Sequence, residues 1–315
     1  MNDSISETIC DLCGSKQYSC IYNMDDAEIV KCDSCGLVFV NPIPDEKQLV
    51  ENVYNEGYFN AEKGYGIDDL TGASKKNSIK KAKELFNEIE KHTKPGKVLD
   101  IGCSAGFYLD VARKRGWQAE GIDIGDYACR FARENLGLNV RTGNFINSDF
   151  KKNDFDVVLL LDVIEHLTSP RQGLMKIRSI LSNGGKLIIE TPNFDSAPSK
   201  ILGKEWGLIE PAHHLFYFTP QTITRLLAET GFEVESVTFP KWGLTDLFLS
   251  AGSFKKAGLK IGLKEKNFVK RYLKMPRYMA RTAVDIADRA VFTPLNKNRN
   301  GIIIKIVAEK TDREI

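Results

Sequence analysis

The sequence lacks any apolar run close to the roughly 18 to 20 residues that a membrane-spanning helix requires. Its first nine residues are also too polar for a secretory signal peptide. Excess charge is nearly absent, since 44 Lys and Arg residues stand against 42 Asp and Glu residues and leave a formal net charge of +2. That balance argues by itself neither for nucleic acid nor for a membrane surface as the partner. We therefore expect a cytoplasmic protein in which 42% hydrophobic residues suffice for a sizeable core.

Cysteine is scarce outside one arrangement, in which four of the seven cysteines form two close pairs. The pairs are Cys10-Asp-Leu-Cys13 and Cys32-Asp-Ser-Cys35, which is the spacing of a zinc ribbon. Two such turns direct four thiols at one ion and supply the tetrahedral all-sulfur set that Zn²⁺ accepts. Four thiolates leave no open position, so the pattern predicts a structural zinc module over residues 1–44. A redox dithiol pair, or a spacing without metal, stays open as an alternative.

A strand, a glycine-rich loop and a helix follow one another in the middle of the chain. The buried strand Val98-Leu-Asp-Ile101 ends in Gly102-Cys-Ser-Ala-Gly106, and apolar residues at helical spacing begin at Phe107. Glycines in such a loop let the backbone approach a ligand closely, and the following helix presents free amides to it. A dinucleotide site is the obvious alternative, but its GxGxxG fingerprint is absent. The match to nicotinamide-dependent enzymes is therefore poor.

The segment Val98 to Gly106 resembles motif I of class I S-adenosylmethionine-dependent methyltransferases. Ala119 to Ile124, Phe155 to Asp162 and Leu181 to Glu190 are similar to the second, fourth and fifth strands of that family, in the same order. The resemblance covers roughly residues 78–310. It implies a Rossmann-like α/β fold with a seven-stranded, mostly parallel sheet and S-adenosyl-L-methionine as the cofactor.

The same resemblance implies a set of cofactor-binding residues. Asp123, at the end of the second strand, corresponds to the acid that holds both ribose hydroxyls, and a carboxylate accepts such a pair well. Asn144 stands where the family usually carries an Asp toward the adenine amino group, and an amide carbonyl can accept from that amine too. The full predicted set is Asp100, Gly102, Ser104, Gly106, Asp123, Asn144, Phe145 and Asp162.

Candidate catalytic residues lie after the fifth strand, in Glu210-Pro-Ala-His-His-Leu-Phe-Tyr-Phe-Thr-Pro220. This segment holds two of the four histidines, and imidazole titrates near neutral pH. It resembles a His-aromatic segment of methyltransferases that act on sugars, in which the histidines face the acceptor. We expect His213 or His214 to act as a base or to orient the acceptor, with a structural cap on the next helix as the alternative. Thr219 followed by Pro220 predicts the start of that helix.

The remaining chain divides around this core. We predict a connector or lid over residues 45–77, the core over 78–241 and 301–310, and a basic helical insertion over 242–300. Residues 251–300 hold 13 Lys or Arg against 3 Asp or Glu, and apolar residues recur among them. Such a pattern suits peripheral contact with anionic lipid at the inner membrane face, or a solvated helical lid. No feature of the sequence indicates an oligomeric state.

The acceptor is expected from the resemblance as well. A four-cysteine module, this core and a histidine segment together resemble methyltransferases of sugar and polysaccharide pathways. We therefore expect methylation of a hydroxyl on a small or lipid-linked glycan acceptor. RNA methylation is the alternative, but the Asn/Asp-Pro-Pro-aromatic motif of methylases that act on base amino groups is absent after the fourth strand. Sugar carbon methylation is a further alternative, although those enzymes read His-Glu-His where this chain has Ala212-His213-His214.

Overall fold

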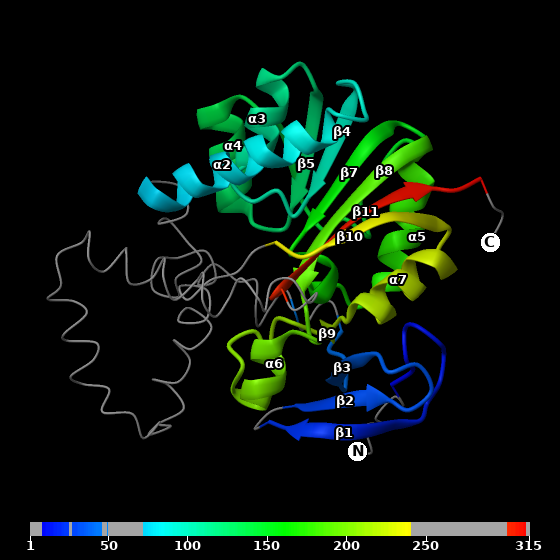
Figure 1. Ribbon diagram of the computed structural model, residues 1–315. Coiled ribbons are helices and arrows are strands. Elements are labelled where there is room, and N and C mark those ends of the chain that lie inside the picture. Colours follow the sequence, from blue (N-terminus) through cyan, green and yellow to red (C-terminus); the bar gives the residue numbers. More distant parts are fainter. Residues whose placement is uncertain (1–7, 25–26, 46–48, 50–71, 241–300, 313–315) are drawn as a thin grey trace, which may run out of the picture.

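The computed structural model describes residues 8–24, 27–45, 49, 72–240 and 301–312. The predicted connector lies mostly outside the described residues, and the predicted basic insertion lies entirely outside them. The described chain forms two sheets (Figure 1). Within the described residues, no helix is both long and apolar enough to cross a membrane.

The larger sheet has seven strands in the order β10-β11-β8-β7-β4-β5-β6. Neighbouring strands are parallel from β8 to β6, whereas β11 runs antiparallel to both β8 and β10. This arrangement confirms the predicted seven-stranded, mostly parallel sheet. Its strands are β4 (Lys97–Ile101), β5 (Gln118–Asp123), β6 (Asn139–Thr142), β7 (Phe155–Leu161), β8 (Leu181–Pro192), β10 (Phe232–Thr238) and β11 (Ile303–Lys310).

Helices cover both faces of this sheet because its central strands are apolar on both sides. On one face, α2 and α3 pack over Val98, Val157 and Ile188. On the other face, α5 and α7 pack over Leu160 and Ile304 (Figure 1). The helices are α2 (Gly72–Ile89), α3 (Phe107–Lys114), α4 (Asp126–Leu136), α5 (Pro170–Ile180), α6 (Ala197–Leu202) and α7 (Pro220–Glu229), with the short 3-10 turns η3 (Ile164–His166) and η4 (Gly203–Glu205).

One helix starts earlier than predicted, and a second starts at the predicted residue. The helical pattern recognised from residue 78 begins earlier, at Gly72, so α2 starts inside the segment predicted as a connector. The predicted start at Thr219 is confirmed: its side chain caps α7 in a reciprocal capping box with Thr222, and Pro220 is the first helical residue.

The N-terminal module is joined to the core by a shared sheet. Its strands β1 (Tyr18–Asn23), β2 (Glu28–Cys32) and β3 (Val38–Asn41) form a meander, and β9 (Phe216–Tyr217) of the core adds a fourth strand beside β3. The backbone N–H of Val40 also donates to the carbonyl of Leu215 at 2.9 Å. The histidine segment that precedes β9 is therefore held by the module as well as by the core.

A second junction ties the module to the start of α5. Asp11, within the first cysteine pair, accepts from the Ser169 hydroxyl at 2.6 Å and from the Arg171 backbone N–H at 2.7 Å. The Arg171 guanidinium donates in return to the Asp11 carbonyl at 2.9 Å and pairs with Glu229 at 2.6 Å. A carboxylate at a helix N-terminus is favourable because free amides and the helix dipole meet it there.

Candidate active site

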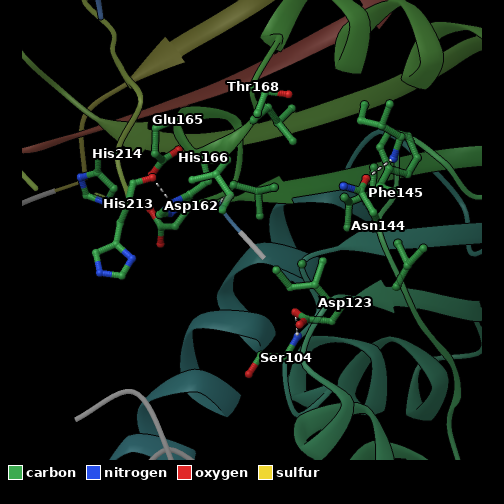
Figure 2. Close-up of a pocket in the computed structure, with 18 of the residues that line it drawn as sticks. Ser104, Asp123, Asn144, Phe145, Asp162, Glu165, His166, Thr168, His213 and His214 are labelled. Carbon is green, nitrogen blue, oxygen red and sulfur yellow. Dashed lines mark hydrogen bonds between the residues drawn. The ribbon is translucent and has the colours of Figure 1, made fainter. Parts of the chain in front are cut away.

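A cavity of about 650 Å³ opens beyond the carboxyl ends of β4, β5, β7 and β8. In an open parallel sheet this is the edge at which ligands bind. Figure 2 shows two groups of polar side chains, with Ser104, Asp123 and Asn144 at one end and the histidines with Glu165 at the other. Eight residues predicted from the sequence line the cavity: Gly102, Ser104, Asp123, Asn144, Phe145, Asp162, His213 and His214.

The glycine loop after β4 adopts a backbone that few side chains tolerate. Gly102 has φ +76°, and Ser104 has φ +45° although it carries a Cβ. A Cβ on Gly102 would lie 2.4 Å from Cγ2 of Val163. Gly102 therefore lets the loop turn tightly against the segment that follows β7, which keeps the cavity open between them.

Gly102→Ala is expected to lower the free energy of unfolding by about 2–5 kcal/mol. The left-handed backbone costs about 1–2 kcal/mol for a side chain, and the clash with Val163, a stiff β-branched residue, adds about 1–3 kcal/mol. Denaturant unfolding measures the change. Gly137→Ala is the matched control, because Gly137 has φ +63° but an added Cβ would meet no atom within 4 Å. Equal losses in the two variants would contradict the contact with Val163.

Asp123 is held facing the cavity by two backbone amides. Its Oδ2 accepts from Ser104 N–H at 2.8 Å, and its Oδ1 accepts from Gly125 N–H at 2.7 Å. Burial raises the pKa of Asp123, and these two donors offset part of that rise. A carboxylate has about four acceptor positions, so capacity remains for two ribose hydroxyls.

Asn144 and Phe145 form the wall beside Asp123. The Asn144 carbonyl oxygen accepts from Ile146 N–H at 2.7 Å, which fixes the side chain and leaves one of its two acceptor positions unused by that bond. Phe145 is buried against Phe150, with ring centroids 5.5 Å apart. An apolar ring next to an amide suits an adenine, and the role predicted for Asn144 stays a prediction.

Asp100 and Gly106 lie behind the wall and are not among the residues that line the cavity. Asp100 is only 3% exposed, and burial followed by the charge of Asp123 raises its pKa to about 8. Gly106 precedes α3 with φ +77°, and an added Cβ would approach Leu138 to 2.6 Å. Their predicted part in cofactor binding stays a prediction.

At the other end of the cavity, two separate segments bring Glu165, His166 and His214 together. His166 Nδ1 lies 2.8 Å from the carbonyl oxygen of His213, and His214 Nδ1 lies 2.8 Å from that of Leu208. The two rings meet edge to face with centroids 4.9 Å apart. Burial lowers the pKa of both histidines, that of His166 to about 4, so both are neutral at pH 7.

Glu165 and Asp162 supply the carboxyl groups of this wall. Glu165 is 1% exposed, accepts from the Thr191 hydroxyl at 2.9 Å, and has its pKa raised by burial. Asp162 has φ +53°, and burial, with the charges of Glu165 and Glu190, raises its pKa to about 8. A strained backbone at such a position is typical of functional sites. His213 is less buried than His214, and it lies in the turn that begins at Glu210.

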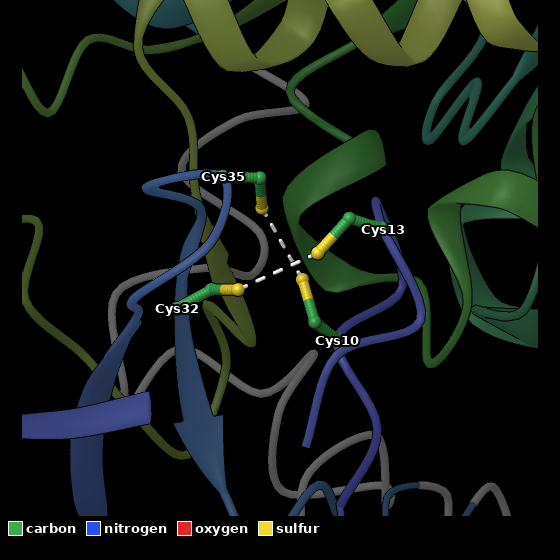
Figure 3. A group of neighbouring side chains, drawn as sticks. All are labelled: Cys10, Cys13, Cys32 and Cys35. Carbon is green, nitrogen blue, oxygen red and sulfur yellow. Dashed lines mark hydrogen bonds between the residues drawn. The ribbon is translucent and has the colours of Figure 1, made fainter. Parts of the chain in front are cut away.

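The four predicted metal ligands do converge. Their sulfur atoms lie within 4.8 Å of one another, with Cys10 to Cys35 and Cys13 to Cys32 each at 3.5 Å (Figure 3). Tetrahedral Zn–S bonds of about 2.3 Å require sulfur atoms about 3.8 Å apart, so the set fits one ion. Although burial opposes it, amides of Cys35 and Ser34 lower the pKa of Cys32 to about 7 and favour its thiolate. The cluster is compatible with a zinc ribbon.

Known proteins resemble this chain in sequence and in fold. The family model described as a methyltransferase domain matches residues 75–237, slightly more than half of the chain. A ubiquinone biosynthesis O-methyltransferase of Nitrosospira multiformis is 27% identical over 47% of this chain and 68% of its own length. One of Idiomarina loihiensis is 29% identical over 42% of this chain and 56% of its own. A tRNA U34 carboxymethyltransferase of Tolumonas auensis is 27% identical over 47% of this chain and 48% of its own length.

Solved structures agree on the fold. A SAM-dependent methyltransferase from Archaeoglobus fulgidus has a TM-score of 0.50 at 22% identity, covering 74% of this chain and 94% of its own. A second match comes from the Haloferax volcanii complex between the Trm112 methyltransferase activator and a methyltransferase. It has a TM-score of 0.52 at 14% identity and covers 78% of this chain and 96% of its own. The chain belongs to the methyltransferase-domain family. It is an S-adenosylmethionine-dependent methyltransferase of the class I fold.

Sequence reasoning missed part of the acceptor end. Four further residues line the cavity, and none of them was predicted as a site residue: Glu165, His166, Thr168 and Leu208. The signal for the first two was the Glu-His pair that follows the fourth strand at the ligand-binding edge. No local pattern marked Leu208, whose carbonyl orients His214.

Proposed function

We propose that this methyltransferase transfers the methyl group of S-adenosylmethionine to a hydroxyl of a sugar in glycan or polysaccharide biosynthesis, on a small or lipid-linked acceptor. The carrying observation is the division of one cavity into two ends. The end with Asp123 and Asn144 offers acceptors for a nucleoside, and the end with Glu165 and the histidines offers partners for a second, polar molecule.

Methyl transfer from a sulfonium is a displacement along one line, so the protein has to align the two reactants and take up the hydroxyl proton. S-adenosylmethionine supplies the activated methyl group when it is bound. His213 or His214 then holds the acceptor hydroxyl or receives its proton. A neutral imidazole can do this at pH 7, and burial of His214 keeps it neutral.

Several observations support oxygen of a sugar as the methylated atom. Two relatives are named as O-methyltransferases of ubiquinone biosynthesis, which supports oxygen as the methylated atom and does not bear on a sugar as its carrier. Vicinal hydroxyls of a sugar match a wall that combines a carboxylate with imidazoles. A lipid-linked acceptor would also give the basic residues of 251–300 an anionic surface to meet.

The test is to incubate the protein with methyl-labelled S-adenosylmethionine and a cell extract, and then to partition the label. Label in water-soluble sugars or in organic-extractable lipid supports the proposal. Nuclease-sensitive label would instead favour RNA as the acceptor, an alternative that the tRNA-modifying relative supports. Label on a sugar that survives ether cleavage with hydriodic acid would move the proposal from oxygen to carbon methylation.

We further propose that the four cysteines bind one structural Zn²⁺. Removing it with a chelator is expected to release at least one equivalent of zinc per chain and to lower Tm, by about 2–4 °C for each kcal/mol lost in a chain of this size. Elemental analysis and a thermal scan measure both. A Cys32→Ser variant should behave like the chelated protein, whereas Cys20→Ser, an exposed cysteine outside the cluster, should not. Metal-free protein that a chelator leaves unchanged would contradict the zinc module.

A further inference from the structure

The acceptor end of the cavity holds a second group of side chains with the composition of a metal site. One ligand atom from each of Glu165, His166 and His214 lies within 4.8 Å of those of the other two. Ligands of one ion, each at about 2.1 Å from it, lie roughly 3–4 Å apart. A small adjustment of the side chains therefore suffices to close the group around one ion.

The hydrogen bonds of the two histidines decide which nitrogen is available. A backbone carbonyl can only accept, so the Nδ1 atoms that lie 2.8 Å from the carbonyls of His213 and Leu208 must both be protonated. In a neutral ring this places the lone pair on Nε2. Both rings thus carry the tautomer of a metal ligand, and each is held in place by a carbonyl behind it.

The carboxylate has equivalent support. Thr191, which is fully buried, donates its hydroxyl to Oε2 of Glu165 at 2.9 Å. Partners of this kind orient the ligands of known metal sites. A carboxylate and two imidazoles therefore meet at one place, with Glu165 and His214 buried. Oxygen and nitrogen lone pairs at such a distance repel one another unless a proton or a metal ion lies between them, and a metal ion can bind all three at once.

We propose that Glu165, His166 and His214 bind a divalent transition-metal ion at the acceptor end of the cavity. Two imidazoles and a carboxylate favour ions such as Zn²⁺, Mn²⁺, Fe²⁺ or Co²⁺ over Ca²⁺ and Mg²⁺, which prefer oxygen. The site differs from the cysteine cluster because the described residues supply three protein ligands in place of four, which leaves positions open to a further ligand.

The open positions indicate the role of the ion, and this part rests on the proposed function. A hydroxyl of the acceptor would bind the ion, which holds the oxygen in place and lowers the hydroxyl pKa. With His214 engaged as a ligand, His213 is the remaining histidine at this end that can receive the hydroxyl proton. The methyl group then moves from sulfur to oxygen, and the proton moves from that oxygen to the imidazole.

The experiment measures Co²⁺ binding to the demetallated full-length protein by titration and absorption. The wild type is expected to bind two ions per chain, one with intense thiolate-to-metal charge-transfer absorption and one without it. His214→Ala and Glu165→Gln should weaken the second ion by at least about 100-fold, and Thr191→Val by about 10- to 100-fold. His213→Ala, which changes the adjacent histidine, should leave both ions bound. Calorimetric binding of S-adenosylmethionine shows that each variant is folded.

The outcomes separate this inference from the proposed function. A single ion with thiolate absorption in the wild type, or a second ion that all three site variants retain, overturns the metal site even if sugar methylation is found. A second ion that is lost in the three variants upholds the site even if the labelled methyl group appears in no glycan.

Discussion

His214→Ala is expected to lower the turnover number by about 10²- to 10⁴-fold while leaving the affinity for S-adenosylmethionine unchanged. A positioned acid–base group contributes an effect of this size, and loss of an acceptor-orienting group acts on the same step. His214 lies at the acceptor end, where its Nδ1 is bonded to the carbonyl of Leu208 and its ring meets that of His166. Initial-rate kinetics with the acceptor identified by labelling, together with calorimetry of the cofactor, separate the two effects.

His213→Ala tests the neighbouring position in the same assays, and at least one of the two variants should show the loss. His92→Ala is the matched control, because His92 is exposed on the turn after α2 and faces no part of the cavity wall. Unchanged turnover in both His213→Ala and His214→Ala would remove the histidine segment from the mechanism.

Asp123→Ala is expected to weaken S-adenosylmethionine binding by about 10²- to 10⁴-fold. Hydrogen bonds to a charged group contribute about 1.5–3 kcal/mol each, and two ribose hydroxyls are lost at once. The variant also frees the amides of Ser104 and Gly125, which Asp123 now holds, so the loop loses its fixed conformation. Isothermal titration calorimetry measures the change directly.

Two further substitutions bracket that result. Asp123→Asn keeps the shape and one acceptor oxygen, and should fall between the wild type and Asp123→Ala. Asp126→Ala removes an exposed carboxylate three residues further on, in the first turn of α4, and should bind the cofactor normally. If Asp123→Ala binds as tightly as Asp126→Ala, the ribose assignment is wrong.

The cofactor end was accessible to sequence reasoning because its determinants are local. The strand, the glycine loop and the helix from Val98 to Phe107 are consecutive, and Gly102 and Asp123 fall at the ends of strands that their own residues specify. In a parallel sheet those ends meet at one edge, so their proximity follows from strand order. Asp100 shows the limit: its position on β4 was correct, but it lies beneath the loop and not on the cavity wall.

The acceptor end could not be derived in the same way because its determinants are distant in sequence. His166 and His214 meet where the segment before β9, a strand of two residues that pairs with β3 of the N-terminal module, is hydrogen-bonded to η3 through Leu215 N–H and the carbonyl of Glu165. A two-residue strand carries no periodic signal. The hydrogen bonds that Asp11 makes to Ser169 and Arg171 likewise join segments about 160 residues apart. The cysteine pairs predicted the module, but they held no information about which core segments it contacts.

The central claim, that this cavity binds the methyl donor between Gly102 and Asn144, is tested most directly by hydrogen–deuterium exchange of the full chain with and without S-adenosylhomocysteine. We predict slower exchange at residues 102–106, 122–125 and 143–146, with the four-cysteine module over residues 8–45 unchanged. Protection that is absent from these three segments, or confined to other parts of the chain, would contradict the account.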